Sequence, residues 1–442
     1  MILPVVIILL ISLFLSGSFL LSKITPQKEN FFFLLGVGFG VFVIIIMSWM
    51  LIFSWIGIPI ERSNATLLFV SIVIASLFLR TKKWPFPSVP PIGKFEYFLL
   101  LLITSLVAFV SLESVLRLPM GWDGLATWLL QAKAIYLAHG LDREIFFYAQ
   151  FDSPPGIGLL VAYFYTLLGG VEDNAVLLLF SAFYVACIFV LYGSIREFTN
   201  RRVALIFVFL FASLQSVIRQ AGRFDAGYVD LPLAYFFLCA GVLLLRYKFT
   251  SKPIFLLLSF LFAGMGSLIK NEGVVFFLFF LLISIRQMLP LRLKKILHIL
   301  PGLLIFLAWL IYKTIGPFYP SYLSHGHLVL ERVFLVSHYM FIEFFRIDRW
   351  NLIWIFLLIC SVAIWRRLLS LLTFQLALFQ LLAYFVIYLL TPLDALEHIH
   401  GSFDRLLLHI TPLVIFSVAF CAYDILNKKS IFKIKHAKRS TA

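Results

Sequence analysis

Charged and polar side chains that adjoin long apolar segments are the residues best placed to do chemistry in this sequence, and they gather in four segments. The first segment, residues 118–174, contains Gly121-Trp122-Asp123-Gly124. The two glycines let the backbone bend closely around Asp123, whose carboxylate then suits a general base or a metal ligand. On spacing alone, an N-cap for the helix that follows is an equally good interpretation of Asp123.

Two other residues of this first segment are secondary candidates. Lys133 lies on an amphipathic stretch, and Asp152 precedes Ser153-Pro154-Pro155-Gly156. An aspartate before Ser-Pro-Pro is typical of a turn or a helix cap, and we prefer that interpretation of Asp152 to a catalytic one.

The second segment, residues 219–232, is a short run rich in arginine and aspartate. It carries Arg219, Arg223, Asp225 and Asp230. Arginine suits bidentate binding of phosphate, and a carboxylate beside it suits a sugar hydroxyl or a cation. The alternative is a set of internal salt bridges, with Asp230 as a structural carboxylate at a helix N-terminus.

The third segment is a very short hairpin, Lys270-Asn271-Glu272-Gly273, between two apolar runs. A lysine on so tight a turn has a fixed direction, which suits a counter-ion for phosphate, and Glu272 beside it is a secondary candidate. A solvated loop charge is the more ordinary interpretation of Lys270.

The fourth segment, residues 393–409, holds His398, His400 and Arg405. Two histidines this close can ligate a metal, but no third ligand at a fixed spacing accompanies them, so hydrogen-bonded interfacial histidines are the favoured interpretation. Arg405, at the mouth of the last apolar run, is a better candidate for a phosphate clamp.

Transmembrane helices are the elements that must position these residues. Of the 442 residues 62% are hydrophobic and 13% charged, and the mean hydropathy of +1.03 excludes a water-soluble enzyme. Apolar runs of about 20 residues, enough to cross ~30 Å of hydrocarbon, predict an all-α polytopic membrane protein with about 13 transmembrane helices. We expect these spans near residues 2–22, 31–57, 65–80, 96–117, 174–195, 203–218, 229–245, 254–269, 273–285, 296–315, 351–365, 368–390 and 406–426. The shorter apolar stretch 156–170 is expected to be re-entrant or interfacial, within a large first extracytoplasmic loop.

The charge balance predicts the orientation of the spans. Lys and Arg number 36 against 21 Asp and Glu, which gives a formal net charge of +15. In so apolar a chain this excess is typical of cytoplasmic loops beside anionic lipid, and no nucleic-acid partner is expected. The positive-inside rule then puts all four polar segments on the extracytoplasmic side of an integral, multi-pass protein. The four cysteines lie inside apolar runs without a CxxC spacing, which predicts neither a disulfide framework nor a thiolate metal site.

Three parts are expected along the chain. Residues 1–95 are an N-terminal three-helix membrane unit with a Pro-rich linker, residues 96–426 a transmembrane domain with its outer loop at 118–174, and residues 427–442 a basic cytoplasmic tail. Residues 316–350, rich in aromatic and basic side chains, are expected to form an aromatic belt at the outer interface, with a lid over the site as the alternative.

The order of the polar segments resembles the membrane glycosyltransferases of the GT-C fold that use lipid-phosphate sugars. This superfamily includes the protein O-mannosyltransferases and the lipid A aminoarabinose transferases, and the resemblance covers roughly residues 96–426. Asp123 is similar to the family's carboxylate in the first outer loop, and Ser153-Pro154-Pro155-Gly156 resembles its Tyr/Lys-Pro-Pro-Leu element. The stretch from Gly227 to Pro232 is similar to the second acidic segment, Lys270 to the Thr-Lys-Gly turn, and Asp404-Arg405 with Pro412 to an Arg…Pro pattern in a late span.

The resemblance implies an inverting transfer from an undecaprenyl- or dolichyl-phosphate sugar to an extracytoplasmic glycan, lipid or protein. It implies that Asp123 is the general base and that Lys270, Arg223 and Arg405 neutralise the departing lipid phosphate. Arg219 is a further donor-binding candidate. Asp230 is expected to hold the sugar or a divalent cation, Mg²⁺ or Mn²⁺, and no other cofactor is implied.

A transporter or flippase of a lipid-linked sugar is the main alternative from another class. Its charged residues should lie near the bilayer midplane on broken helices, whereas the central thirds of the expected spans hold almost no charge. A purely structural membrane subunit is a third interpretation.

Overall fold

The computed structural model describes residues 2–25, 29–79, 91–141, 153–289, 293–315 and 326–426. All regular elements in these ranges are helices, which confirms the expected all-α polytopic fold. Nine of the described helices are long and apolar enough to cross a membrane, or ten if one bent pair counts as a span. By length and apolar character, the described helices therefore do not reach the 13 transmembrane helices that the sequence predicts, because some of the expected spans form shorter or more polar helices.

The first half of the chain supplies four long helices, a group of short helices, and a helical hairpin. The long helices are α1 (Ile2–Ile24), α2 (Phe31–Trp55), α3 (Arg62–Leu79) and α4 (Lys94–Leu116). The group of short helices contains a π-helical segment η1 (Gly124–Leu129), α5 (Leu130–Leu137), α6 (Gly156–Leu168) and α7 (Asp173–Val176). The hairpin and its continuation are α8 (Leu178–Phe198), α9 (Arg201–Ala212) and α10 (Gln215–Gly222).

The second half consists of long helices interrupted by one group of short ones. The long helices are α11 (Asp230–Thr250), α12 (Pro253–Ile269), α13 (Asn271–Met288), α14 (Leu293–Ile315), α17 (Ile353–Ser370), α18 (Leu372–Leu390) and α19 (Ala395–Leu426). The short group is a 3-10 turn η4 (Leu330–Arg332), α15 (Val333–Phe344) and α16 (Ile347–Trp350).

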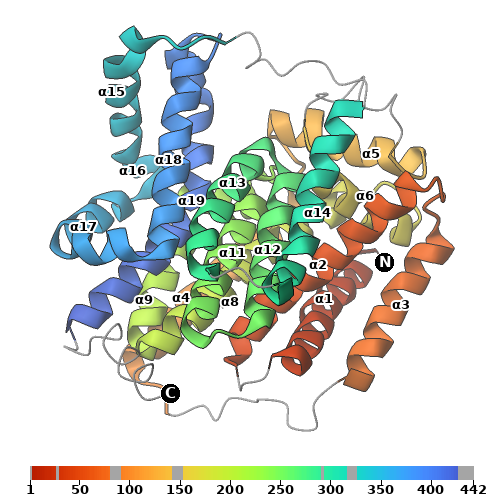
Figure 1. Cartoon of the computed structure of the whole chain (residues 1–442). Coiled ribbons are helices and arrows are strands. Elements are labelled where there is room, and N and C mark those ends of the chain that lie inside the picture. Colours follow the sequence, from red (N-terminus) through yellow and green to blue (C-terminus); the bar gives the residue numbers. More distant parts are fainter. Residues whose placement is uncertain are drawn as a thin grey trace.

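Helix α11 lies at the centre of the bundle and packs against α8, α12 and α19. Every residue from Asp230 to Tyr247 is buried, so no side of α11 faces solvent or lipid. This burial explains why α11 is apolar on all sides. In Figure 1, α15, α16 and α17 lie on one flank of the bundle beside α18, and α1 and α3 lie on the opposite flank.

The N-terminal helices pack directly against this central group. Gly36 of α2 faces Val190 of α8, and Gly193 of α8 faces Phe33 of α2, so that the two backbones approach closely. The hydroxyl of Tyr235 on α11 donates to the carbonyl of Gly36 at 2.6 Å. The division of the chain near residue 95 stays a prediction, and the Pro-rich linker falls largely within residues 80–90, outside the described residues.

Three expected elements differ from the structure. The span expected at 203–218 is broken between α9 and α10, which meet at an angle of 68°. The last span was expected to begin at residue 406, but α19 begins at Ala395, so the predicted fourth polar segment is mostly helical. Helix α6, within the stretch expected to be re-entrant or interfacial, is buried from Gly156 to Thr166, which does not fit a helix lying on the interface.

We predict that Gly193→Ala destabilises the protein. A Cβ at this position would lie 2.6 Å from the backbone nitrogen of Phe33, closer than real Cβ contacts, so α2 and α8 must move apart. Overpacking of this kind costs about 1–3 kcal/mol. The unfolding temperature of the purified protein in detergent should fall. Gly170→Ala is the matched control, because nothing lies within 4 Å of its added Cβ and its unfolding temperature should stay at the wild-type value. An equal temperature for both variants would contradict the close packing of α2 on α8.

Candidate active site

A buried ion pair stands at the first residue of α11. Lys270, in the tight connection between α12 and α13, places its Nζ 2.7 Å from Oδ1 of Asp230. The same ammonium lies 3.0 Å from Oε1 of Glu272. The hairpin that the sequence predicted therefore presents Lys270 inward to two carboxylates, and the interpretation of a solvated loop charge does not hold.

Asp230 is held by two other donors besides Lys270. Nε2 of His409 lies 2.8 Å from Oδ1, and Nε2 of Gln220 donates to Oδ2 at 3.3 Å. Because a carboxylate can only accept, His409 donates through Nε2, and its Nδ1 lies 2.8 Å from the hydroxyl of Tyr384. Protein groups thus occupy both oxygens of Asp230. This arrangement suits a carboxylate that orients Lys270, and it suits less well a carboxylate that contacts a sugar or a metal.

The charge of Lys270 is stabilised by these neighbours. Burial alone would lower the pKa of its ammonium, but Asp230 and Glu272 outweigh this effect and raise the pKa above its ordinary value. Lys270 is therefore a cation that its two carboxylate partners hold in a fixed position.

A second ion pair, between Asp123 and Arg405, lies beside the first. A guanidinium nitrogen of Arg405 contacts Oδ2 of Asp123. The side chains of Arg405 and Asp123 keep 22% and 29% of their surface exposed, whereas Asp230 keeps 2%. Arg405 and His409 are four residues apart on α19 and so share one face of that helix. The two ion pairs are therefore neighbours, and the second is the one open to a ligand.

The loop that carries Asp123 is fixed by the turn before α11. A Cβ on Gly121 would lie 2.5 Å from the ring of Tyr228, and one on Gly124 would lie 3.1 Å from the carbonyl oxygen of Ala226, so glycine permits this close approach. The N–H of Asp123 donates to the Tyr228 hydroxyl at 3.4 Å. The side chain of Asp123 makes no capping bond to the π-helical segment that follows, so the N-cap interpretation is wrong.

The other charged candidates form salt bridges elsewhere. Arg223 pairs with Glu113 of α4 at 3.2 Å, and Arg219 pairs with Asp225 at 2.9 Å. Lys133 pairs with Asp173 at 2.6 Å. Within the described residues, the side chains of Arg223, Arg219 and Lys133 form no ion pair with Asp230 or Lys270. The structure thus shows the internal salt bridges that were the alternative for the second segment.

The two histidines expected as possible metal ligands do not converge. Nδ1 of His398 lies 3.0 Å from the hydroxyl of Thr391, and His400 is exposed with its ring 5.5 Å from that of Tyr339. Among the described residues no three His, Cys, Asp or Glu side chains form a group that could hold a metal ion. Asp152 lies outside the described residues.

Sequence reasoning missed the residues that support the ion pairs. His409, Gln220 and Tyr384 hold Asp230 in place, and Tyr228 holds the loop of Asp123. One signal in the sequence points to His409: it lies inside an apolar run, four residues after Arg405. Polar residues at that depth are costly unless they are paired.

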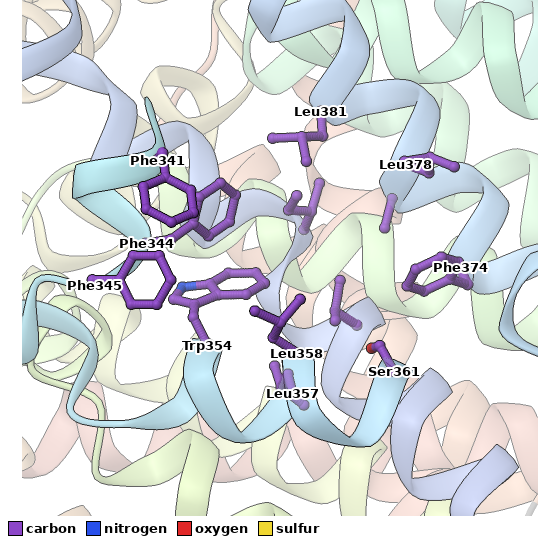
Figure 2. A pocket seen from close by; sticks show the side chains of 13 residues that line it. Phe341, Phe344, Phe345, Trp354, Leu357, Leu358, Ser361, Phe374, Leu378 and Leu381 are labelled. Atoms are coloured by element: carbon purple, nitrogen blue, oxygen red, sulfur yellow. The ribbon is translucent and has the colours of Figure 1, made fainter. Parts of the chain in front are cut away.

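An apolar cavity of about 350 Å³ borders α19, the helix that also carries Arg405 and His409. Figure 2 shows it between α15, α17 and α18, and Ile410 and Val414 of α19 also line it. Ile410, which lines it, directly follows His409 on α19. Almost all of its lining is aromatic or aliphatic, with Ser361 as the polar exception. A hydrocarbon chain can occupy this space, and a sugar or a phosphate cannot be held by its walls.

The α15–α16 region is tied to the site by a separate set of charges. Arg349 of α16 lies 2.7 Å from Oδ2 of Asp404 and 3.4 Å from Oε1 of Glu343. Asp404 precedes Arg405 on α19, so the same turn of α19 carries one link to the short helices and one to Asp123. Of the region expected to be a belt or a lid, residues 316–325 lie outside the described residues.

A solved structure and a protein-family model are similar to this chain. Among solved structures, the crystal structure of ArnT from Cupriavidus metallidurans bound to undecaprenyl phosphate is similar at 13% sequence identity with a TM-score of 0.49. This likeness covers 73% of the present chain and 60% of that chain, so the protein spans less than two thirds of the length of ArnT. No curated protein matches the chain significantly. Residues 152–312, which carry Asp230 and Lys270, match the model of the dolichyl-phosphate-mannose-protein mannosyltransferase family, and this similarity confirms the resemblance to glycosyltransferases that the sequence indicated.

Proposed function

We propose that this protein is a membrane glycosyltransferase that moves a sugar from a polyprenyl-phosphate donor to a glycan, lipid or protein acceptor, with inversion. The observation that carries the proposal is the presence of two neighbouring ion pairs, Lys270 with Asp230 and Arg405 with Asp123, in a bundle that also holds an apolar cavity. The family match over residues 152–312 supports the same reaction class.

The two cations suit the lipid phosphate. When the bond between the sugar and the phosphate breaks, negative charge grows on the phosphate oxygens, and fixed cations stabilise that charge most effectively where water is scarce. Lys270 is held in place by Asp230, and Arg405 offers several donors in one plane for bidentate binding. We assign both residues to the donor phosphate.

Asp123 suits the general base. It keeps 29% of its side chain exposed, whereas Asp230 is enclosed by three donors and has no free oxygen to attack a sugar. One available carboxylate fits a single displacement, in which the base takes the acceptor proton while the acceptor attacks the sugar, and this displacement inverts the anomeric carbon.

The placement of the charges also supports an enzyme over a transporter. Asp123 precedes a helical segment, Asp230 begins α11, and Lys270 joins two helices, so these three residues stand at helix ends. The charge pattern of the sequence supports an extracytoplasmic position for this end.

We predict that Asp123→Asn abolishes transfer, because the amide keeps the shape of the carboxylate but cannot accept the proton. Loss of a general base costs roughly 10²–10⁴-fold in rate. The test is mass spectrometry of surface glycans from a deletion strain that carries each variant, with circular dichroism to verify folding. Asp348→Asn, at a side chain that is 62% exposed and pairs with Arg346, is the matched control and should restore wild-type glycans. Wild-type glycans in the Asp123→Asn strain would refute the assignment.

We predict that Ala377→Phe weakens the use of a long-chain donor. Ala377 of α18 lines the cavity, and a phenyl ring there would take the place of part of the isoprenoid chain. Loss of burial for two CH₂ groups costs about 1.5 kcal/mol, so KM for a long-chain donor should rise about tenfold. Leu382→Phe is the control on the same helix, since Leu382 faces outward with 50% of its surface exposed. If both variants keep the wild-type KM, the cavity does not hold the lipid.

A further inference from the structure

Both cations of the site are already neutralised by carboxylates in this structure. Lys270 contacts Asp230 and Glu272, and Arg405 contacts Asp123. Asp404, next to Arg405, is balanced by Arg349 at 2.7 Å. The cluster therefore holds three carboxylates against two cations. An incoming phosphate that takes the Arg405 nitrogen now bound to Asp123 must replace the carboxylate of Asp123.

The two ion pairs differ in how easily they can be broken. Asp230 has three donors and keeps 2% of its side chain exposed, so its removal from Lys270 would leave a buried charge with too few partners. Within the described part of the chain, the carboxylate of Asp123 has one hydrogen-bonding partner, Arg405, and its exposed surface can regain water. The pair between Asp123 and Arg405 is therefore the one that a phosphate can open.

Arg405 is held by two further contacts besides the one with Asp123. Its second terminal nitrogen donates to the carbonyl of Gly401 at 3.2 Å, and its guanidinium lies 5.3 Å from the centre of the Tyr228 ring. These contacts do not involve Asp123. They leave the guanidinium at the mouth of the site, ready to bind an anion in place of the carboxylate.

We propose that the phosphate of the lipid donor displaces Asp123 from Arg405, so that binding of the donor itself frees the carboxylate that takes the acceptor proton. This inference rests on the proposed function and deepens it. Before the exchange, a guanidinium nitrogen of Arg405 occupies Oδ2 of Asp123, so this oxygen is not free to accept the acceptor proton. After the exchange, the acceptor O–H proton passes to Asp123 and the acceptor oxygen bonds to the anomeric carbon. The bond between the anomeric carbon and the phosphate oxygen breaks, and its electron pair stays on the phosphate beside Lys270 and Arg405.

The exchange makes an unusual prediction for a residue at a binding site. Since Asp123 competes with phosphate for Arg405, Asp123→Asn should bind polyprenyl phosphate about tenfold more tightly than the wild type, although it cannot catalyse transfer. The measurement is the Kd of undecaprenyl phosphate for the full-length protein in lipid nanodiscs. Asp123→Ala, which also removes the competing charge, should show the same tightening and serves as the second variant.

Two comparisons make the test decisive. Asp348→Asn removes one negative charge from a side chain that pairs with Arg346 and not with Arg405, and it should leave Kd unchanged, which separates local competition from a change in net charge. In the background of Arg405→Gln, Asp123→Asn should no longer tighten binding. Equal or weaker binding by both Asp123 variants, or tightening that persists without Arg405, would overturn the exchange. Failure of the wild type and all variants to bind undecaprenyl phosphate would instead overturn the proposed function.

Discussion

A charged side chain can stay in the interior of a helical bundle only when it is paired and hydrogen-bonded, and the pair of Lys270 with Asp230 is the interaction on which the site depends. Asp230 begins the central helix α11, and Lys270 comes from the adjacent turn between α12 and α13. The supporting donors come from α10 and α19, through Gln220 and His409. One ion pair thus fixes how four parts of the bundle meet, and Arg405 is placed by the same face of α19 that carries His409.

Helix α11 separates this site from a second buried group of charges. Arg246 lies 16 residues after Asp230, about 24 Å along the helix axis at 1.5 Å per residue. It pairs with Glu29 and Glu197, and its guanidinium stacks over the ring of Phe33. This second group joins the N-terminal part of the chain to α8 and α11. Charges therefore anchor both ends of a central helix whose remaining surface is apolar.

Much of the helical framework could be predicted from the sequence, because long apolar runs leave few alternatives to helices in a membrane. The break between α9 and α10 could not be predicted, because Ser213 and Leu214 carry no strong signal for a bend and the 68° angle depends on what surrounds them. The early start of α19 at Ala395 was also missed. The charged residues from Glu397 to Arg405 lie before the span that the sequence predicts, but in the structure Asp404 and Arg405 are paired with side chains of other elements.

The candidate site, too, could be predicted only in part from the sequence. Residue types and order brought Asp123, Asp230, Lys270 and Arg405 to attention, and the structure places them together. Sequence could not say which arginines join them: Arg223 and Arg219 have the same chemistry as Arg405 but pair with Glu113 and Asp225. That choice depends on contacts between residues more than 100 positions apart in the chain, such as Arg223 with Glu113 and Arg405 with Asp123. Spacing within one segment carries no information about such contacts.

The most direct test of the phosphate site is an experimental structure of the full-length protein with undecaprenyl phosphate in a lipid nanodisc. The expected result is a phosphate group within hydrogen-bonding distance of Lys270 Nζ and the Arg405 guanidinium, with Asp123 turned away from Arg405 and the isoprenoid chain in the cavity lined by Phe344 and Trp354. A phosphate bound elsewhere, with the Asp123–Arg405 pair intact, would contradict the central claim.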